Sequence, residues 1–244
     1  MNFGKVNIFT GHFGSGKTET AVNFSVMLLK KGYKTALADM DIVNPYFRSA
    51  DVKEKMTGMG MKVIVPIFAN TNTDVPALTG EINIVFEDKE LYSVLDVGGD
   101  DLGAKVISTY KKKIIKTDYR HFFTVNVKRP ATSDSDKIIK YVREIENASG
   151  LKVTGLVNNT NLMNLTLPDD IIEGKKIIER AADALNIPVS FHCVMCESVS
   201  NCTFSDEAVM DYDSECKKYL RFLSDKDNVL LMKKYIGNLR GVQR

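Results

Sequence analysis

The chain carries the stretch GHFGSGKTE at residues 11–19, between an apolar run, KVNIFT, and a longer segment, TAVNFSVMLLKKG. Gly11, Gly16, Lys17 and Thr18 have the spacing G-x-x-x-x-G-K-[ST]. Glycines allow such a loop to wrap around a phosphate with its backbone N–H groups exposed, and a helix that begins there adds the positive end of its dipole. The stretch therefore predicts a phosphate-binding loop between a strand and a helix. The alternative is an ordinary glycine-rich turn.

All residues of this loop are candidates for nucleotide contact. Lys17 is expected to reach the β- and γ-phosphates, which makes it a candidate catalytic residue. The hydroxyl of Thr18 is expected to bind Mg²⁺. The candidate nucleotide-binding set in the loop is Gly11, His12, Phe13, Gly14, Ser15, Gly16, Lys17, Thr18 and Glu19.

Strand-like and helix-like segments alternate along the chain. Apolar runs predict strands at 5–10, 34–38, 62–67, 92–97, 121–127, 152–158 and 189–194. Helical spacing of apolar residues predicts helices at 17–31, 102–116, 134–148 and 168–185. This alternation implies right-handed βαβ units, so we predict a fold of the α/β class with three αβα layers and a mainly parallel sheet. We expect residues 1–244 to form one domain with a mostly helical C-terminal segment from about residue 205.

Three aspartates follow strands of the predicted sheet. Asp39 and Asp41 lie in LADMDIVNPYFRS, and Asp96 ends the apolar run of LYSVLDVGGDD. In open α/β sheets, ligands bind at the carboxyl ends of the strands, so we expect these carboxylates near the loop. Asp39 and Asp96 are candidate metal residues together with Thr18. Either Asp39 or Asp41 could orient an attacking water, with turn aspartates and solvated loop acids as the alternatives.

The composition argues against several classes of protein. The 33 basic and 31 acidic residues leave a formal charge of +2, which gives no support for a nucleic-acid or anionic-membrane surface. No apolar run approaches the about 20 residues that a membrane span needs, and the glycine loop begins too early for a signal peptide. The four cysteines are expected to be reduced thiols of a cytoplasmic protein. They are Cys193, Cys196, Cys202 and Cys216.

Three elements, GHFGSGKT, ALADMDIVNPYF and VLDVGGDD, stand in this order and resemble the P-loop ATPases of the MinD/ParA and CobQ/CobB group. That group also includes the nitrogenase iron protein and the arsenite-pump ATPases. The resemblance covers roughly residues 6–199, and GLVNNTN supplies a fourth element, a strand that ends in Gly-x-(apolar)-x-Asn. The stretches GHFGSGKTE, DIVNPYFRS and DVGGDDLGA look like a subset known only as ATP-binding or ParA-like proteins.

The resemblance implies roles for individual residues. By resemblance, Asn159 contacts the adenine and Asp41 orients the attacking water in switch I. Asp39 and Asp96 lie near Mg²⁺ in the same comparison, and Gly98–Gly99 forms switch II. Lys17, Asp41 and Asp96 are therefore the candidate catalytic residues.

One position departs from the group. MinD/ParA members carry a second lysine directly after the first glycine of the loop, and this lysine reaches the partner's nucleotide in a face-to-face dimer. Here the position is His12, and histidine is shorter and mostly neutral at pH 7. The lysine-mediated contact is therefore absent, and a homodimer stays an open possibility. Arg48 or Arg129 could supply a charge across such an interface.

The expected base is adenine. GTP sites commonly use an Asn-Lys-x-Asp element whose acid pairs with the guanine amino group. The stretch NNTN at 158–161 has neither this lysine nor this acid. ATP and Mg²⁺ are therefore the expected cofactors.

Two further clusters have mainly structural explanations. A metal site could be drawn from His192, Cys193, Cys196 and Cys202, but buried thiols commonly act as small apolar side chains. Lysines gather on the predicted helix 102–116, where a solvated face is expected and a DNA-binding patch is the alternative. These lysines are Lys111, Lys112, Lys113 and Lys116.

The sequence predicts a protein that binds Mg-ATP, hydrolyses it slowly to ADP and acts as a switch on an unidentified protein partner. The first alternative is an ATP-dependent small-molecule synthetase, ligase or kinase of the same fold group. NTNTDVPALTG and NVKRPATSDSD could line its second pocket. The second alternative, a DNA-partition-type ATPase, is disfavoured by the near-neutral charge. The third is a nucleotide-binding module without turnover.

Overall fold

A computed structural model describes residues 1–41, 50–65, 80–99, 101–196, 220, 223 and 227–235. Arg48, Asp100, Cys202 and Cys216 lie outside the described residues, as does nearly all of the stretch NTNTDVPALTG. Side chains at 50–52, 80, 101 and 102 are likewise not described.

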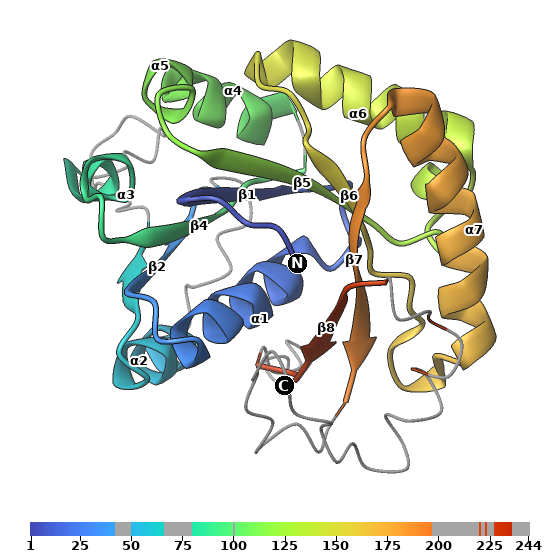
Figure 1. Cartoon of the computed structure of the whole chain (residues 1–244), viewed down its shortest axis with the longest axis horizontal. Helices are drawn as coiled ribbons and strands as arrows, with labels where there is room; N and C mark the ends of the chain where they lie inside the picture. Colours follow the sequence, from blue (N-terminus) through green and yellow to red (C-terminus); the bar gives the residue numbers. More distant parts are fainter. Residues whose placement is uncertain are drawn as a thin grey trace, which may run out of the picture.

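The described strands form one parallel sheet in the order β3-β2-β4-β1-β5-β6-β7-β8 (Figure 1). The central strand β1 lies between β4 and β5, which is where the order along the sheet reverses direction. Such a reversal leaves a crevice at the carboxyl ends of the strands. The strands are β1 (Val6–Thr10), β2 (Thr35–Asp39), β3 (Lys62–Ile64), β4 (Tyr92–Asp96), β5 (Tyr119–Val125), β6 (Gly155–Asn158), β7 (Val189–Met195) and β8 (Val229–Met232).

Helices cover both faces of this sheet, which confirms the predicted three-layer α/β architecture. The α-helices are α1 (Lys17–Lys30), α2 (Ala50–Gly58), α3 (Ile84–Glu87), α4 (Asp101–Thr109), α5 (Lys111–Ile114), α6 (Ser135–Ser149) and α7 (Pro168–Leu185). Short 3-10 helices occur at Gly80–Asn83, Pro130–Thr132 and Met163–Leu165.

Neighbouring residues of β1 point to opposite faces and so contact different helices. Phe9 packs in the cluster that contains Phe24 and Leu28 of α1. Ile8 packs in the cluster that contains Ile107 of α4. A third cluster joins α4, α6 and α7 on the face of Ile8, whereas Met56 of α2 lies on the face of α1 (Figure 1). Each fully buried phenylalanine contributes about 1.5–3 kcal/mol through the hydrophobic effect.

Helix α1 is buried on more than one side. Ala21, Phe24, Ser25 and Leu28 are fully buried, as their spacing predicts, but Val22 on another side is buried as well. The middle strands of the sheet cover one side of α1, and the edge strand β8 with the residues after it covers another (Figure 1). The aromatic rings of Phe9, Phe24, Phe122 and Phe191 meet at centroid distances of 5.2–6.4 Å in this layer.

Two expectations need correction, and one strand was not expected. Val229–Met232 forms strand β8 inside the segment from about residue 205 that is expected to be mostly helical, and most of the rest of that segment lies outside the described residues. The predicted helix 102–116 is divided at Tyr110 into α4 and α5. Cys196 is disulfide-bonded, so the prediction of four reduced thiols is wrong for this cysteine.

None of the helices in the described part of the chain combines the length and the apolar character that crossing a bilayer requires.

Candidate functional site

The glycine loop connects the carboxyl end of β1 to the first residue of α1, and its glycines are required by space as well as by backbone angle. Gly14 and Gly16 have φ of 80° and 79°, a region that favours glycine. A Cβ on Gly16 would lie 2.3 Å from Nδ2 of Asn159. A Cβ on Gly11 would lie 2.5 Å from the carbonyl oxygen of Thr124. The loop is therefore held in a tight turn at the amino end of α1, as the motif predicts.

Lys17 joins the loop to two of the predicted carboxylates. Its Nζ lies 3.1 Å from Oδ2 of Asp41 and 3.4 Å from Oδ1 of Asp96. The same Nζ lies 3.4 Å from Oγ1 of Thr18. The residues come from the ends of β1, β2 and β4, which adjoin in the sheet, so the structure brings together the predicted side chains of three separate segments.

Asp39 is the last residue of β2, at the carboxyl end of the strands. It pairs in register with Asp96 on the adjacent strand, so both carboxylates leave the sheet on the same face. The Oδ1 of Asp39 accepts a hydrogen bond from the backbone N–H of Asp41 at 3.0 Å. Asp39 is fully buried. It therefore shapes the turn that carries Asp41 in addition to adding negative charge.

Negative charge exceeds positive charge in this buried group. Burial alone would lower the pKa of Lys17, but the charges of Asp96, Asp41 and Asp39 hold it above its usual value. Burial raises the pKa of the Asp96 carboxyl, against the opposing charge of Lys17 and a hydrogen bond with Thr18. One oxygen of Asp96, Oδ2, is buried without a hydrogen-bond partner among the described residues. A further cation beside Thr18 and Asp96 fits this arrangement.

The glycines after β4 pack directly on the loop. A Cβ on Gly99 would lie 2.0 Å from the carbonyl oxygen of Gly11, so only glycine allows this approach. The N–H of Val97 donates to the carbonyl of Phe9 at 3.0 Å, which holds the segment as it leaves the sheet. A change in the position of Gly98–Gly99 would therefore change the packing against Gly11 of the loop.

Asn159, predicted to contact a base, braces the loop. Its Nδ2 donates to the carbonyl oxygen of Ser15 at 2.7 Å, and only 3% of the residue is exposed. In turn, Nδ2 of Asn161 donates to the backbone oxygen of Asn159 at 2.8 Å. The structure thus places Asn159 against the loop.

Glu19 holds the C-terminal segment of the described chain. Its Oε1 accepts from the N–H of Tyr235 at 2.7 Å and from Nδ2 of Asn23 at 3.2 Å. Asn23 also exchanges two hydrogen bonds with the backbone of Lys233, at 2.8 and 2.9 Å. The residue after Thr18 therefore links the start of α1 to the segment that follows β8, a connection that the sequence pattern did not indicate.

His12 and Phe13 differ in their surroundings. The ring of His12 meets Tyr141 of α6 edge to face at a centroid distance of 4.9 Å. Its Nδ1 lies 3.1 Å from the carbonyl oxygen of Phe13. The side chain of Phe13 is 80% exposed at the tip of the loop. His12 is thus held by its own chain.

Arg129 also contacts the loop from within the chain. Its Nε donates to the carbonyl oxygen of Gly14 at 3.1 Å. From the sequence, Arg129 is expected only as a residue that could place a positive charge across a homodimer interface. The contact with Gly14 could not be found from spacing, because the two residues are 115 positions apart.

The cysteine and histidine cluster has another explanation in the structure. Cys193 is buried and free, and burial raises the pKa of its thiol to about 12. The Nδ1 of His192 pairs with Nδ2 of Asn158 at 3.0 Å, and its Nε2 lies 3.6 Å from Asp227. Within the described residues, His, Cys, Asp and Glu side chains form no group of three or more that could hold a metal.

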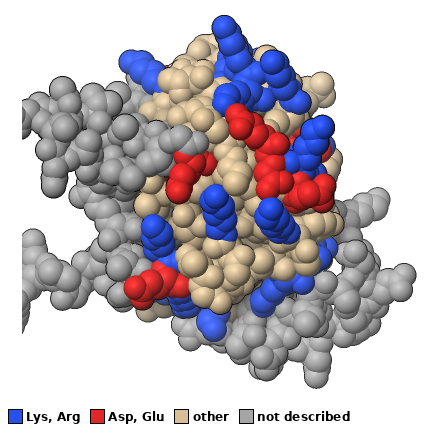
Figure 2. Space-filling model, turned by 90° about the vertical axis from the view of Figure 1, so that its left-hand side faces the viewer, with Lys and Arg blue, Asp and Glu red and all other residues tan. Residues whose placement is uncertain are grey.

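The lysines of the region 111–116 lie on a surface that carries both basic and acidic side chains. Figure 2 shows basic side chains gathered over the end of the molecule where α5 lies in Figure 1, with acidic ones immediately below them. Lys113 pairs with Glu87 at 2.9 Å and donates to Asn83 at 2.7 Å. The lysines therefore lie beside acids and do not form a continuous positive surface in this view.

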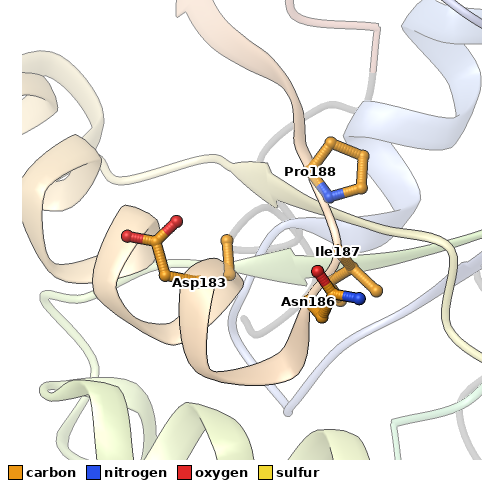
Figure 3. A pocket seen from close by; sticks show the side chains of 5 residues that line it. Asp183, Asn186, Ile187 and Pro188 are labelled. Atoms are coloured by element: carbon orange, nitrogen blue, oxygen red, sulfur yellow. The ribbon is translucent and has the colours of Figure 1, made fainter.

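A surface pocket lies at the opposite edge of the sheet from the loop (Figure 3). It occurs where α7 ends and the chain turns into β7, and Asp183, Asn186, Ile187 and Pro188 are labelled there. It brings together no group of titratable side chains, so it is not the reactive site. Its lining residues are Ala182, Asp183, Asn186, Ile187 and Pro188.

A family model described as the CobQ/CobB/MinD/ParA nucleotide binding domain matches residues 8–187. The chain belongs to this family. The match includes the glycine loop, the three aspartates and Asn159, and it ends before β8. No curated protein matches the chain.

Solved structures share the fold at low sequence identity. The cell division protein FtsY from Thermotoga maritima has a TM-score of 0.52 and 21% identity, covering 78% of this chain and 61% of its own. Chloroplast FtsY from Physcomitrella patens has a TM-score of 0.49 and 18% identity, covering 77% of this chain and 57% of its own. An FlhF complexed with GTP/Mg²⁺ has a TM-score of 0.49 and 15% identity, covering 78% of this chain and 66% of its own. This chain thus spans about three fifths of the length of the FtsY chains, and the likeness is one of fold.

Proposed function

We propose that this chain binds Mg-ATP at the loop of residues 11–18, hydrolyses it slowly, and uses the bound nucleotide to signal to a protein partner. The observation that carries the proposal is the meeting of Lys17 with Asp41 and Asp96 at 3.1 and 3.4 Å, beside Thr18. These groups come from three adjoining strand ends and surround the amino end of α1. Membership of the nucleotide-binding family supports the same reading.

The residues fit a Mg²⁺ ion. Thr18 offers a hydroxyl, and Asp96 offers a buried carboxylate oxygen that has no hydrogen-bond partner in the described part of the chain. Oxygen ligands of this kind suit Mg²⁺, which commonly keeps several of its waters. When bound with a nucleotide, the ion would neutralise charge on the phosphates. We infer that Thr18 and Asp96 hold it, with Asp39 supporting Asp96 from the neighbouring strand.

The chain's own groups can position a phosphate and a water. The backbone N–H groups of the loop and the amino end of α1 favour an anion, and Lys17 keeps its charge because three carboxylates raise its pKa. We assign Asp41 to orient the water, because its side chain contacts Lys17 at 3.1 Å and keeps 11% exposure, whereas Asp39 is fully buried. Phosphoryl transfer asks the protein mainly for positioning and charge stabilisation.

ATP is proposed over GTP. The segment after β6 carries amides and a hydroxyl, in NNTN, and has no acidic side chain to pair with the guanine amino group. The FlhF structure contains GTP, but that protein is too distant to decide the base for this chain. Binding of ATP and GTP measured side by side tests this assignment.

A nucleotide-dependent switch requires that binding at the loop changes the position of a segment that a partner can contact. Two segments contact the loop and then lead away from it. One follows β2 and contacts Lys17 through Asp41. The other follows β4, packs on Gly11 through Gly99 and leads into α4. A phosphate that draws Lys17 away from Asp41 would release one of these contacts. We infer that the two segments serve as switches I and II, and that a homodimer or another protein reads their positions.

The test is ATP turnover by the pure protein, with the molar mass recorded with and without Mg-ATP. Slow turnover is expected, with a nucleotide-dependent change in mass if the reader is a second copy. Negligible turnover and no nucleotide-dependent change would contradict the proposal.

A small-molecule synthetase, ligase or kinase is the second candidate, favoured by one observation. The turn at residues 126–132, part of NVKRPATSDSD, lies against the loop through Arg129 and could border a second substrate. A rise in ATP turnover on addition of a metabolite would favour this candidate over the switch.

A further inference from the structure

Arg129 contacts the phosphate loop at Gly14. Its Nε donates to the carbonyl oxygen of Gly14 at 3.1 Å. Gly14 has φ of +80°, and a Cβ placed on it would lie 3.3 Å from Nε and 3.7 Å from Cζ of Arg129. The guanidinium therefore covers Gly14 closely, and a glycine at this position makes room for it.

The backbone that carries Arg129 is firmly held. Its N–H donates to the carbonyl of Asn126 at 3.1 Å, and its own carbonyl accepts from the N–H of Thr132 at 3.0 Å. Asn126 in turn donates through Nδ2 to the carbonyl of Asn161 at 3.0 Å. The turn after β5 is thus tied to the segment after β6, so the position of the guanidinium does not depend on a mobile side chain alone.

The charge of Arg129 is not neutralised by the described residues. A guanidinium has five N–H donors, and only Nε has a protein acceptor in this part of the chain. The neighbouring cation differs: Lys128 pairs with Asp170 at 2.8 Å and with Glu173 at 2.6 Å. Arg129 thus has the terminal donors and the charge needed to bind an anion at the loop.

Within residues 11–19, Lys17 is the only Lys or Arg side chain. Lys17 is shared between Asp41 and Asp96, whereas hydrolysis spreads negative charge over the three equatorial oxygens of the transferred phosphoryl group. A second cation close to the loop would stabilise that charge. Arg129 is the arginine that the described structure places in contact with the loop.

We propose that Arg129 is a catalytic residue that acts in cis, binding the terminal phosphate of the nucleotide held by its own chain. This role rests on the proposed function. In the reaction, a water oxygen forms a bond to the γ-phosphorus while the bond from that phosphorus to the β–γ bridging oxygen breaks. The products are ADP and inorganic phosphate, and the water's proton passes to the phosphate or the solvent. Arg129 stays charged throughout and transfers no proton.

The first test compares three variants by steady-state kinetics and ATP affinity. Arg129→Ala should lower kcat by about a hundredfold or more while ATP affinity changes far less. Arg129→Lys should recover part of the lost kcat, because it restores the charge without the planar fork. Lys128→Ala removes the adjacent cation and should behave like the wild type. A wild-type kcat for Arg129→Ala would overturn the proposal, and thermal unfolding checks that each variant is folded.

The second test separates action in cis from action in trans. Arg129→Ala keeps the loop lysine, and Lys17→Ala keeps the arginine, so a mixed dimer would rebuild one complete site only if Arg129 acts on a partner's nucleotide. No recovery of turnover on mixing is expected, at any ratio of the two. Recovery would overturn the cis assignment. If the wild type binds no ATP, the proposed function fails together with this role, whereas ATP turnover that is unaffected by Arg129→Ala removes only this role.

Discussion

Nζ of Lys17 lies 3.1 Å from Oδ2 of Asp41, although the two residues follow different strands, β1 and β2. The pair connects the phosphate loop to the segment that leaves β2. A nucleotide phosphate that binds Lys17 competes with Asp41 for the same ammonium group. Nucleotide binding and the position of Asp41 are therefore coupled through one ion pair, and this coupling is the basis of the switch that we propose.

Asp41→Asn separates binding from hydrolysis. The amide keeps the size of the side chain but removes its charge, so Lys17 is freer to bind phosphate. ATP affinity should be unchanged or higher, and turnover should fall by at least about tenfold because the amide oxygen is a weaker, uncharged acceptor for the water. Single-turnover kinetics and equilibrium binding give the two numbers. Asp183→Asn, at the opposite edge of the sheet (Figure 3), is the matched control. Turnover equal to the wild type would mean that another residue orients the water.

Asn159→Ala distinguishes a loop brace from a base contact. Loss of the hydrogen bond to Ser15 leaves a buried carbonyl without its donor, so affinity for ATP, GTP and inorganic triphosphate should fall alike, by about fivefold to tenfold. A loss confined to ATP would show that Asn159 reads adenine and that the brace is unimportant. Asn228→Ala removes a similar side-chain-to-backbone hydrogen bond, to Ser190, away from the loop and serves as the control.

Two buried histidines predict sensitivity to acid. Burial lowers the pKa of His121 and of His192 to about 4, whereas an unfolded histidine titrates near 6.5. Between these values the unfolded chain binds more protons, so the free energy of unfolding falls as the pH drops from about 6.5 towards 4. Each histidine should remove roughly 2 kcal/mol at pH 5.

Denaturant unfolding at pH 7 and pH 5 measures this effect. His121→Asn and His192→Asn should each remove about half of the pH dependence, whatever they do to stability at pH 7. Burial of both rings favours their neutral form, and each ring has a hydrogen-bond partner there, Thr10 for His121 at 2.9 Å and Asn158 for His192 at 3.0 Å. A pH dependence that neither variant changes would assign the acid sensitivity to other groups.

The meeting of Lys17 with Asp96 could be predicted from the sequence, although 79 positions separate them. Both follow apolar runs that become parallel strands, and the carboxyl ends of parallel strands share one edge of a sheet. The register confirms the reason, because Phe9 of β1 pairs with Asp96 of β4. Patterns of this kind predict which residues share an edge, and a known motif then supplies the chemistry.

Contacts between a side chain and a distant backbone could not be predicted. Arg129 on Gly14 and Asn159 on Ser15 depend on how the turns after β5 and β6 fold over the loop. Apolar periodicity carries no signal for such contacts, because their side chains are polar and stand outside the periodic segments. The sequence therefore predicts the components of the site better than the way they are braced.

Strand β8 and the break at Tyr110 were missed for a related reason. Val229–Met232 is a four-residue apolar run among charged residues, and such a run is compatible with a strand or a helix. Its pairing with β7 and its position beside α1 decide the outcome. The sequence around Tyr110 has neither proline nor glycine, so the division between α4 and α5 arises from packing.

The central claim is that Lys17 holds a nucleotide phosphate at the glycine loop. Its most direct test is the equilibrium binding of Mg-ATP to the wild type and to Lys17→Ala, with Lys112→Ala as a control that removes one positive charge from α5. We predict that the wild type and Lys112→Ala bind Mg-ATP equally and that Lys17→Ala binds at least about a hundredfold more weakly. Equal affinity of the wild type and Lys17→Ala for Mg-ATP would contradict the account.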